Sequence, residues 1–290
     1  MRIDAALARA AAELAEVSDS PRLDAELLLA RALDVTRTYL AAHPEDELDD
    51  AARQRFLQAV SRRGQGTPLA YITGTREFWS LELMVSPETL VPRPETELLV
   101  EIALDLLPRR GPCRVLDLGT GSGAIALALA HERPGWDVTA TDVSGAALAV
   151  ARENARQLSL PNVTFLEGDW TAPVAGRTFD LVVSNPPYVQ SGDPALAALA
   201  HEPARALTPG EDALSAIRIL ARDCRALLAP GAPLLLEHGV GQEGDVAGIL
   251  AYHGWTGIES FEDLAGRPRA ALARRGTRGP AVPPTTEGST

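Results

Sequence analysis

A regular alternation of strand-like and helix-like segments in the second half of the chain places the strongest limit on its fold. Short apolar runs are separated by amphipathic segments from Arg114 to Arg274. The predicted strands span residues 114–118, 137–141, 163–166, 179–184, 233–236, 256–261 and 270–274. This alternation is typical of an α/β fold in which helices cover both faces of a mainly parallel sheet. Ligands in such folds bind at the carboxyl ends of the strands, so motifs that follow strands are the first candidates for a site.

The first 75 residues carry a helical pattern instead of this alternation. Apolar residues there recur three or four positions apart, as one face of a helix requires. Two such stripes consist of Ile3, Leu7, Ala10, Leu14 and Val17, and of Leu23, Leu27, Ala30 and Leu33. Because this region holds no catalytic constellation, we expect a small helical bundle that docks a protein partner.

These patterns divide the chain into four parts. We predict an N-terminal helical substrate-docking domain over residues 1–75, a hairpin linker over 76–92, a catalytic α/β domain over 93–276 and a disordered tail over 277–290. The linker is expected because the apolar spacing changes to that of a hairpin within 77–85. The tail is rich in Gly, Pro, Thr and Ser, a composition that does not support a packed core.

A glycine-rich loop, Asp117–Gly123, follows the first predicted strand. Its glycines allow a tight turn and a close approach of the backbone to a ligand, and the next helix directs its N–H groups toward a negative group. Asp142 ends the second predicted strand, nineteen residues after Gly123, where a carboxylate can accept both hydroxyls of a ribose. The expected cofactor contacts are therefore Gly119, Thr120, Gly121, Ser122, Gly123 and Asp142.

The loop alone does not separate two cofactors. Gly119, Gly121 and Ala124 also satisfy the G-x-G-x-x-A form of the dinucleotide fingerprint, and both NAD and S-adenosyl-L-methionine contain an adenosine ribose. S-adenosylmethionine is favoured because its carboxylate needs a helix N-terminus but no long diphosphate groove. Trp170, after the third predicted strand, is a candidate to stack on the adenine, with Asp169 beside it.

The motif Asn185-Pro186-Pro187-Tyr188 follows the fourth predicted strand. A proline cannot donate to a strand ladder, so the strand ends here and Asn185 is held extended at the edge of the sheet. Pro186 and Pro187 present carbonyl oxygens without a competing N–H, and Tyr188 adds a flat face. Two acceptor oxygens beside an aromatic wall suit a planar –NH2 group whose nitrogen reacts.

Composition limits the class of partner. The formal net charge of -12 argues against duplex DNA or an anionic membrane as the partner. Cys113 and Cys224 are the only cysteines, which fits a reducing compartment, and the five histidines show no metal-site spacing. No apolar run approaches membrane-spanning length. We therefore expect a cytoplasmic protein, a monomer, with no metal ion.

With these motifs in view, the chain resembles the glutamine-N5 methyltransferases of peptide chain release factors. The resemblance runs from about Leu7 to Arg274. It rests on Pro68–Gly74, Phe78-Trp79, Val91–Glu97, Asp117–Gly123, Gly168–Trp170, Asn185–Tyr188, His201–Pro203 and Ala206-Leu207. The Asn-Pro-Pro-Tyr motif is shared with amino-methylating DNA enzymes, whereas the Arg-Pro-Glu-Thr-Glu segment and the helical N-domain are more specific.

This resemblance implies a Rossmann-like, S-adenosylmethionine-dependent methyltransferase fold with a mainly parallel seven-stranded sheet. The acceptor would be the side-chain amide of the Gln in a Gly-Gly-Gln motif of a release factor. The cofactor would contact the Gly119–Gly123 loop, Asp142, Trp170 and Asn185. The acceptor amide would lie against Asn185–Tyr188.

The residues of the motif predict a mechanism without a general base. A carboxamide nitrogen is a poor nucleophile because its lone pair is delocalised. Asn185 Oδ1 and the Pro186 carbonyl would each accept one N–H and so orient this nitrogen, while Tyr188 would restrict the pocket to a slim, flat amide. Arg93 is a candidate contact for a backbone carbonyl or an acidic group of the partner, with a solvated or interdomain salt-bridging arginine as the alternative.

Two further carboxylates are considered beside the motif. Glu202 could fix the pocket loop by hydrogen bonding or could be an ordinary exposed residue before a proline. The segment Glu237-His238-Gly239 ends a strand at the same edge, and we interpret it as structural.

Three other functions remain open from the sequence. Flipped adenine or cytosine bases offer the same –NH2 group, so a nucleic-acid amino-methyltransferase is one alternative. A non-enzymatic nucleotide-binding adaptor is the second, although it would have no use for the acceptor motif. An NAD-linked enzyme is the third, and tight binding of S-adenosylmethionine without NAD binding would exclude it.

Overall fold

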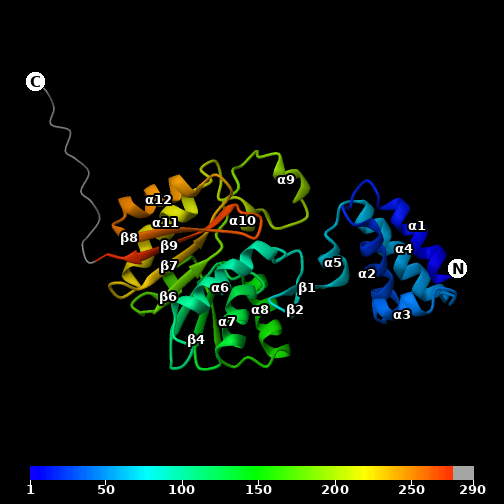
Figure 1. Cartoon of the computed structure of the whole chain (residues 1–290), viewed down its shortest axis with the longest axis horizontal. Coiled ribbons are helices and arrows are strands. Elements are labelled where there is room, and N and C mark those ends of the chain that lie inside the picture. Colours follow the sequence, from blue (N-terminus) through cyan, green and yellow to red (C-terminus); the bar gives the residue numbers. More distant parts are fainter. Residues whose placement is uncertain (277–290) are drawn as a thin grey trace, which may run out of the picture. The chain divides into compact units, whose positions relative to one another are not determined.

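The computed structural model of the chain describes residues 1–276, and these form two compact units (Figure 1). The first unit consists of Met1–Thr75 together with Val85–Pro87. The second consists of Arg76–Met84 and the chain from Glu88 onward. The tail predicted to be disordered lies outside the described residues, and the four-part division of the chain stays a prediction.

The first unit is helical. Its helices are α1 (Ile3–Glu13), α2 (Pro21–Leu33), α3 (Arg37–Ala42), α4 (Asp50–Gly64) and α5 (Leu69–Thr73). The core of the unit includes the buried side chains of Leu7, Leu29 and Phe56, which come from three different helices. The Asp49 side chain caps α4 by accepting a hydrogen bond from the Ala52 N–H at 2.6 Å. Burial of these apolar side chains, more than helix propensity, stabilises such short helices.

The stripe predicted for α2 is only partly confirmed, because Ala30 is buried and Leu33 packs against the core. Leu23 is 39% exposed, whereas Leu28 and Leu29 are buried. The reason is that α2 packs against α1, α3, α4 and α5, so leucines on several of its sides are covered. Val17 was also predicted to face the core, but α1 ends at Glu13 and Val17 is exposed.

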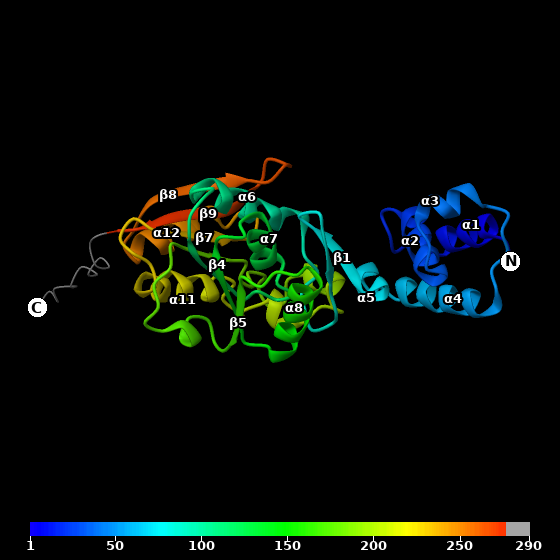
Figure 2. The same ribbon diagram turned by 90° about the horizontal axis from the view of Figure 1, so that it is seen from below.

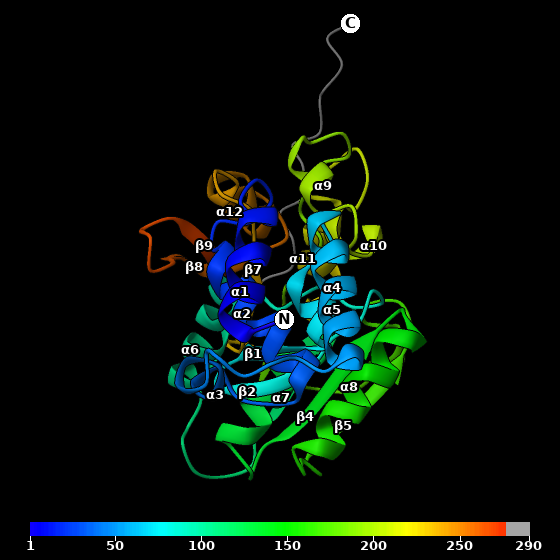
Figure 3. The ribbon, with the colours of Figure 1, turned by 90° about the vertical axis from the view of Figure 1, so that its right-hand side faces the viewer.

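The second unit contains a seven-stranded sheet, as predicted. Its strand order is β5-β4-β3-β6-β7-β9-β8. The strands are β3 (Arg114–Leu118), β4 (Asp137–Asp142), β5 (Val163–Glu167), β6 (Leu181–Ser184), β7 (Pro233–Glu237), β8 (Trp255–Glu262) and β9 (Pro268–Arg275). The first five are parallel, and β9 is antiparallel to both β7 and β8. Figure 2 shows the β8–β9 hairpin, and Figure 3 shows β4 and β5 side by side at the other edge, next to α8.

Helices cover both faces of this sheet. One face packs on α6 (Glu97–Leu106), α7 (Ala124–Glu132) and α8 (Gly145–Gln157), and the other packs on α11 (Ser215–Asp223) and α12 (Glu243–Tyr252). Successive residues of β3 alternate between the two cores: Val115 belongs to the first, and Leu116 and Leu118 belong to the second. Both faces of the central strands are therefore buried, as expected for parallel strands.

Short elements complete the second unit, although Thr75, the first residue of one of them, belongs to the first unit. They are the hairpin β1 (Thr75–Phe78) and β2 (Leu81–Met84), the 3₁₀ helices η1 (Pro94–Thr96), η2 (Ala172–Val174) and η3 (Cys224–Ala226), and the helices α9 (Ala195–Ala198) and α10 (Ala204–Leu207). The hairpin turns at Trp79 and Ser80, both of which have positive φ. Among the helices of residues 1–276, none combines the length and the apolar character needed to cross a membrane.

Candidate active site

The glycine loop connects β3 to α7 at the carboxyl edge of the sheet. Gly119, Gly121 and Gly123 have φ of 74°, 57° and 88°, which L side chains rarely adopt. The N–H groups of Gly119 and Thr120 both donate to the Thr141 carbonyl at 2.9 Å, so the loop is tied to the end of β4. These hydrogen bonds anchor the backbone of the loop in the conformation that its glycines permit.

A buried carboxylate, Asp117, is hydrogen-bonded to this loop and to the start of α7. Asp117 is 1% exposed, and its Oδ2 accepts from the Thr120 hydroxyl at 2.6 Å and from the Ala126 N–H at 3.2 Å. Its Oδ1 has no hydrogen-bond partner among the described residues. Burial raises the pKa of Asp117 to about 7, against the lowering effect of the two hydrogen bonds. This residue joins the loop to the first turn of α7.

Replacing Gly123 with alanine is expected to lower the free energy of unfolding by about 1–3 kcal/mol. A Cβ on Gly123 would lie 2.9 Å from Leu127 Cδ1 and 3.2 Å from Ala151 Cβ, in addition to the strain of positive φ. Gly121→Ala is the matched control, because it has positive φ but no atom within 4 Å of its Cβ. Urea unfolding should show a clearly larger loss for Gly123→Ala. Equal losses would show that strain alone sets the effect.

Asp142, the last residue of β4, is fixed by two backbone donors. Its Oδ2 accepts from the Gly121 N–H at 2.9 Å, and its Oδ1 accepts from the Ser144 N–H at 2.8 Å. Ser144 in turn caps α8 by accepting from the Ala147 N–H. The carboxylate is thus oriented between the glycine loop and the start of α8.

A cavity opens between these elements. It is lined by Glu88, Thr89, Leu90, Gly119, Gly121, Thr141, Asp142, Val143, Ser144, Ala147, Gly168, Asp169, Trp170, Asn185, Pro187, Pro203, Arg205 and Ala206. Its empty volume is about 780 Å³, including the part open to solvent. We call it the loop cavity.

Five of the residues predicted to contact the cofactor line the loop cavity: Gly119, Gly121, Asp142, Trp170 and Asn185. The other three do not. The side chains of Thr120 and Ser122 are buried, the first on Asp117, and Gly123 lies against Leu127.

Trp170 contributes a flat apolar surface to the loop cavity. Its backbone has φ of 40°, and its carbonyl accepts from the Thr141 hydroxyl at 3.3 Å. The indole lies close to Gly119, because a Cβ built there would be 3.6 Å from a ring carbon. The aromatic face and the glycine loop therefore bound the same space.

Asn185 lies where the loop cavity meets a second cavity. The second cavity, here called the motif cavity, is lined by Leu90, Arg93, Asn185, Pro186, Pro187, Tyr188, Val189, Leu199, Ala206 and Leu207. The two cavities share Leu90, Asn185, Pro187 and Ala206. Asn185 Nδ2 donates to Thr96 Oγ1 at 3.1 Å, and Asn185 Oδ1 has no donor among the described residues. The Asn185 Nδ2 atom is therefore anchored to Thr96, and the Asn185 Oδ1 atom is available to a ligand.

Tyr188 and Arg93 both line the motif cavity. The Tyr188 hydroxyl donates to Glu237 Oε1 at 2.9 Å. Arg93 forms an ion pair with Glu202, whose Oε2 also accepts from the Val91 N–H at 3.0 Å. Glu202 thus holds the segment around Arg93 in place. A contact between Arg93 and a substrate stays a prediction.

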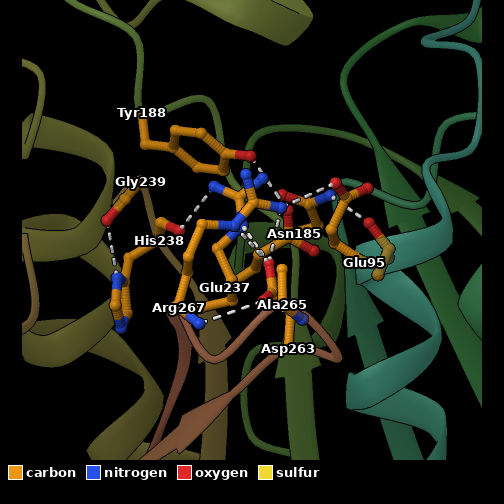
Figure 4. A network of polar contacts seen from close by, with 11 residues as sticks. Glu95, Asn185, Tyr188, Glu237, His238, Gly239, Asp263, Ala265 and Arg267 are labelled. Atoms are coloured by element: carbon orange, nitrogen blue, oxygen red, sulfur yellow. Dashed lines mark hydrogen bonds and ion pairs between the residues drawn. The ribbon is translucent and has the colours of Figure 1, made fainter. Parts of the chain in front are cut away.

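Sequence reasoning missed the role of Thr96 and undervalued Glu237. Figure 4 shows Glu237, Tyr188 and Asn185 within one polar network. Glu237 ends β7 and is 1% exposed, and the Thr96 hydroxyl is hydrogen-bonded to its carboxylate. Burial raises the pKa of Glu237, against the lowering effect of the Thr96 and Tyr188 hydroxyls. An acid at the carboxyl end of a central strand was the available signal.

Comparison with known proteins agrees with this geometry. Residues 5–74 match the PrmC N-terminal domain family, and residues 95–215 match the methyltransferase small domain family. The release factor glutamine methyltransferase of Coxiella burnetii is 46% identical over 264 residues, covering 91% of this chain and 95% of that protein. That of Burkholderia pseudomallei is 49% identical, with coverage of 91% and 95%.

Solved structures show the same fold. A methyltransferase from Pyrococcus furiosus aligns with a TM-score of 0.53 at 19% identity, covering 74% of this chain and 97% of that one. The resemblance inferred from the motifs is confirmed by the full-length relatives. The chain belongs to the release factor glutamine methyltransferase family.

Proposed function

We infer that this chain transfers a methyl group from S-adenosylmethionine to the side-chain amide nitrogen of a glutamine in peptide chain release factors. The family named by its relatives carries this activity in its name. The observation that carries the inference is the position of Asn185, which lines both the loop cavity and the motif cavity. An amide nitrogen held by Asn185 in the motif cavity would face the loop cavity. We propose that the acceptor glutamine belongs to a Gly-Gly-Gln motif.

The residues of the loop cavity fit S-adenosylmethionine. Asp142 is an oriented acceptor for ribose hydroxyls, Trp170 offers an apolar face to the adenine, and Gly119 and Gly121 leave the backbone accessible. When bound, the cofactor supplies an electrophilic methyl group on a sulfonium, whose sulfur keeps the bonding electron pair. The match of the loop to the dinucleotide fingerprint does not by itself show that NAD is the cofactor.

The motif cavity supplies orientation for the acceptor. We propose that Asn185 Oδ1 accepts one amide N–H and that the Pro186 carbonyl accepts the other. Neither oxygen has a protein donor among the described residues. Pro187 and Tyr188 bound the cavity and would exclude water from one side of the amide. Holding a weak nucleophile in line can supply several of the roughly 7–11 kcal/mol available to proximity.

Asp142→Ala is expected to weaken S-adenosylmethionine binding by about 100-fold, since hydrogen bonds to a charged group each contribute about 1.5–3 kcal/mol. Asp142→Asn keeps one acceptor oxygen and should lie between wild type and the alanine variant. Isothermal titration calorimetry with S-adenosylmethionine measures this series. If both variants bind like wild type, Asp142 does not hold the ribose.

The proposed reaction is tested with methyl-labelled S-adenosylmethionine and intact release factor. Label should pass to the release factor and not to duplex or single-stranded DNA offered at the same concentration. Transfer to DNA instead would favour the amino-methyltransferase alternative. Cofactor binding without transfer to any acceptor would favour the adaptor.

We propose further that the enzyme is a cytoplasmic monomer that does not bind DNA. The net charge of -12 and the two free, buried cysteines support this view. Sedimentation tests the monomeric state, and a salt-titrated filter-binding assay tests the absence of DNA binding. The first unit, which contributes no residue to either cavity, is proposed to dock the release factor. A higher kcat/KM for intact release factor than for a short Gly-Gly-Gln peptide would agree with docking.

A further inference from the structure

A buried carboxylate lies behind the acceptor side of the site. Glu237 is 1% exposed, and its Oε2 has no hydrogen-bond partner among the described residues. Buried carboxylates with an unpaired oxygen are costly and need an explanation. The two hydroxyls that do reach Glu237 belong to Tyr188 and Thr96, and both lead toward the motif cavity.

Thr96 connects Glu237 to Asn185, and the hydrogen-bonding role of its hydroxyl follows from the charge of Glu237. An ionised carboxylate only accepts hydrogen bonds, so when Glu237 is ionised the Thr96 hydroxyl donates to it. Thr96 Oγ1 is then left to accept, and it receives the Asn185 Nδ2–H at 3.1 Å. This order places Nδ2 on the protein side and Oδ1 on the ligand side. It also polarises the Asn185 amide, because hydrogen bonds in such a chain strengthen one another.

In the proposed reaction, positive charge moves from the sulfonium of the cofactor to the acceptor nitrogen. The acceptor nitrogen becomes positive as its lone pair forms the new bond to carbon, and it stays positive until it releases a proton to water. The links of Glu237 are to Thr96 and Tyr188 on the motif-cavity side, and none is to Asp142 or the glycine loop. A negative charge placed nearer the acceptor than the donor favours the transition state over the ground state.

We propose that Glu237 is a positioning residue for methyl transfer, which acts through Thr96 on Asn185 and stabilises the positive charge that develops on the acceptor nitrogen. This rests on the proposed function. It assigns a role in the reaction to a residue that touches neither substrate nor cofactor.

Glu237→Gln removes the charge at almost constant shape. We expect kcat to fall by roughly 10- to 100-fold, the effect of one charge several ångströms away at an effective dielectric constant of about 20. The KM for release factor and the Kd for S-adenosylmethionine should stay within about 2-fold of wild type, because neither cavity is lined by Glu237.

Thr96 offers a test that does not alter the carboxylate. Thr96→Val keeps the shape but breaks the link to Asn185, and kcat should fall by about 10-fold or more, as for Glu237→Gln. Thr96→Ser keeps the hydroxyl and should retain most of the wild-type kcat. This pair keeps the proposal testable even if Glu237→Gln folds poorly.

Asp263→Asn is the matched control. Asp263 is a second buried carboxylate of the same network, and it is paired with Arg267 (Figure 4). Its kcat should equal that of wild type. An equal loss in Asp263→Asn, or a loss in Thr96→Ser as large as in Thr96→Val, would show a general loosening of the network and overturn the proposal.

The pH profile of kcat is the second readout. The groups that face Glu237 are Tyr188, Thr96, Arg269 and Glu95, with His238 next to it on the chain. Because the ionised form is the active one, wild-type kcat should rise with pH through the pKa of Glu237, and Glu237→Gln should lack this rise. If wild type is active and Glu237→Gln has the same kcat and the same pH profile of kcat, the proposed role of Glu237 is overturned and the proposed function is not. A wild type that methylates no release factor would overturn the proposed function as well.

Discussion

Replacing Asn185 with alanine is expected to lower kcat for glutamine methylation by about 10³-fold, the upper part of the range for losing one preorganised hydrogen-bond partner of a reacting group. The variant loses the one side-chain oxygen that lies at the junction of the two cavities. It also loses the anchor to Thr96, so the end of β6 no longer carries an oriented amide. Binding of S-adenosylmethionine should change much less, because Asp142, Trp170 and the glycine loop remain in place.

Single-turnover transfer to release factor and calorimetry with S-adenosylmethionine separate these two effects. Gln190→Ala is the control, since Gln190 follows the same motif, is exposed and lines neither cavity. Its kcat should match wild type. An Asn185→Ala variant that transfers at the wild-type rate would show that the acceptor amide is held elsewhere.

The second large effect is a pH dependence of stability that originates at Asp117. Burial raises the folded-state pKa of Asp117 from 3.8 to about 7. The folded state therefore binds a proton that the unfolded state has already lost between these values. This contribution to stability is fully present below pH 4 and is lost as pH rises to about 7. The change is about 1.4 kcal/mol per pH unit, or about 4 kcal/mol in total.

Asp117→Asn removes this titration. The difference in stability between the variant and wild type therefore reports on Asp117 alone. The variant should gain stability relative to wild type as pH rises from about 4 to 7, and the difference should then level off. Urea unfolding of both proteins across this range measures the difference in the free energy of unfolding. A difference that does not change with pH would mean that Asp117 is ionised throughout in the folded protein.

The strands and the glycine loop could be predicted because local rules determine them. The apolar runs of the parallel strands are buried on both faces, and three alternating glycines after a strand permit few structures other than a tight ligand-binding loop. The end of β6 at Ser184 follows from the two prolines. The residues of the site that these rules cover are Gly119, Gly121, Asp142 and Asn185.

Features that depend on packing were not predictable in the same way. The buried side of α2 is determined by four neighbouring helices, which periodicity does not reveal. The short helices α9 and α10 have no periodic pattern because each has only one turn. The link from Asn185 to Thr96 joins residues 89 positions apart, and that from Tyr188 to Glu237 joins residues 49 apart. Only the tertiary fold brings these residues together.

The most direct test of the account is to locate the methyl group. Wild-type protein is incubated with S-adenosylmethionine and intact release factor, and the product is sequenced by tandem mass spectrometry. We predict one added methyl group on the side-chain amide of the glutamine in the Gly-Gly-Gln motif, with Asn185→Ala giving almost none. A methyl group on another residue or on nucleic acid, with this glutamine unmodified, would contradict the account.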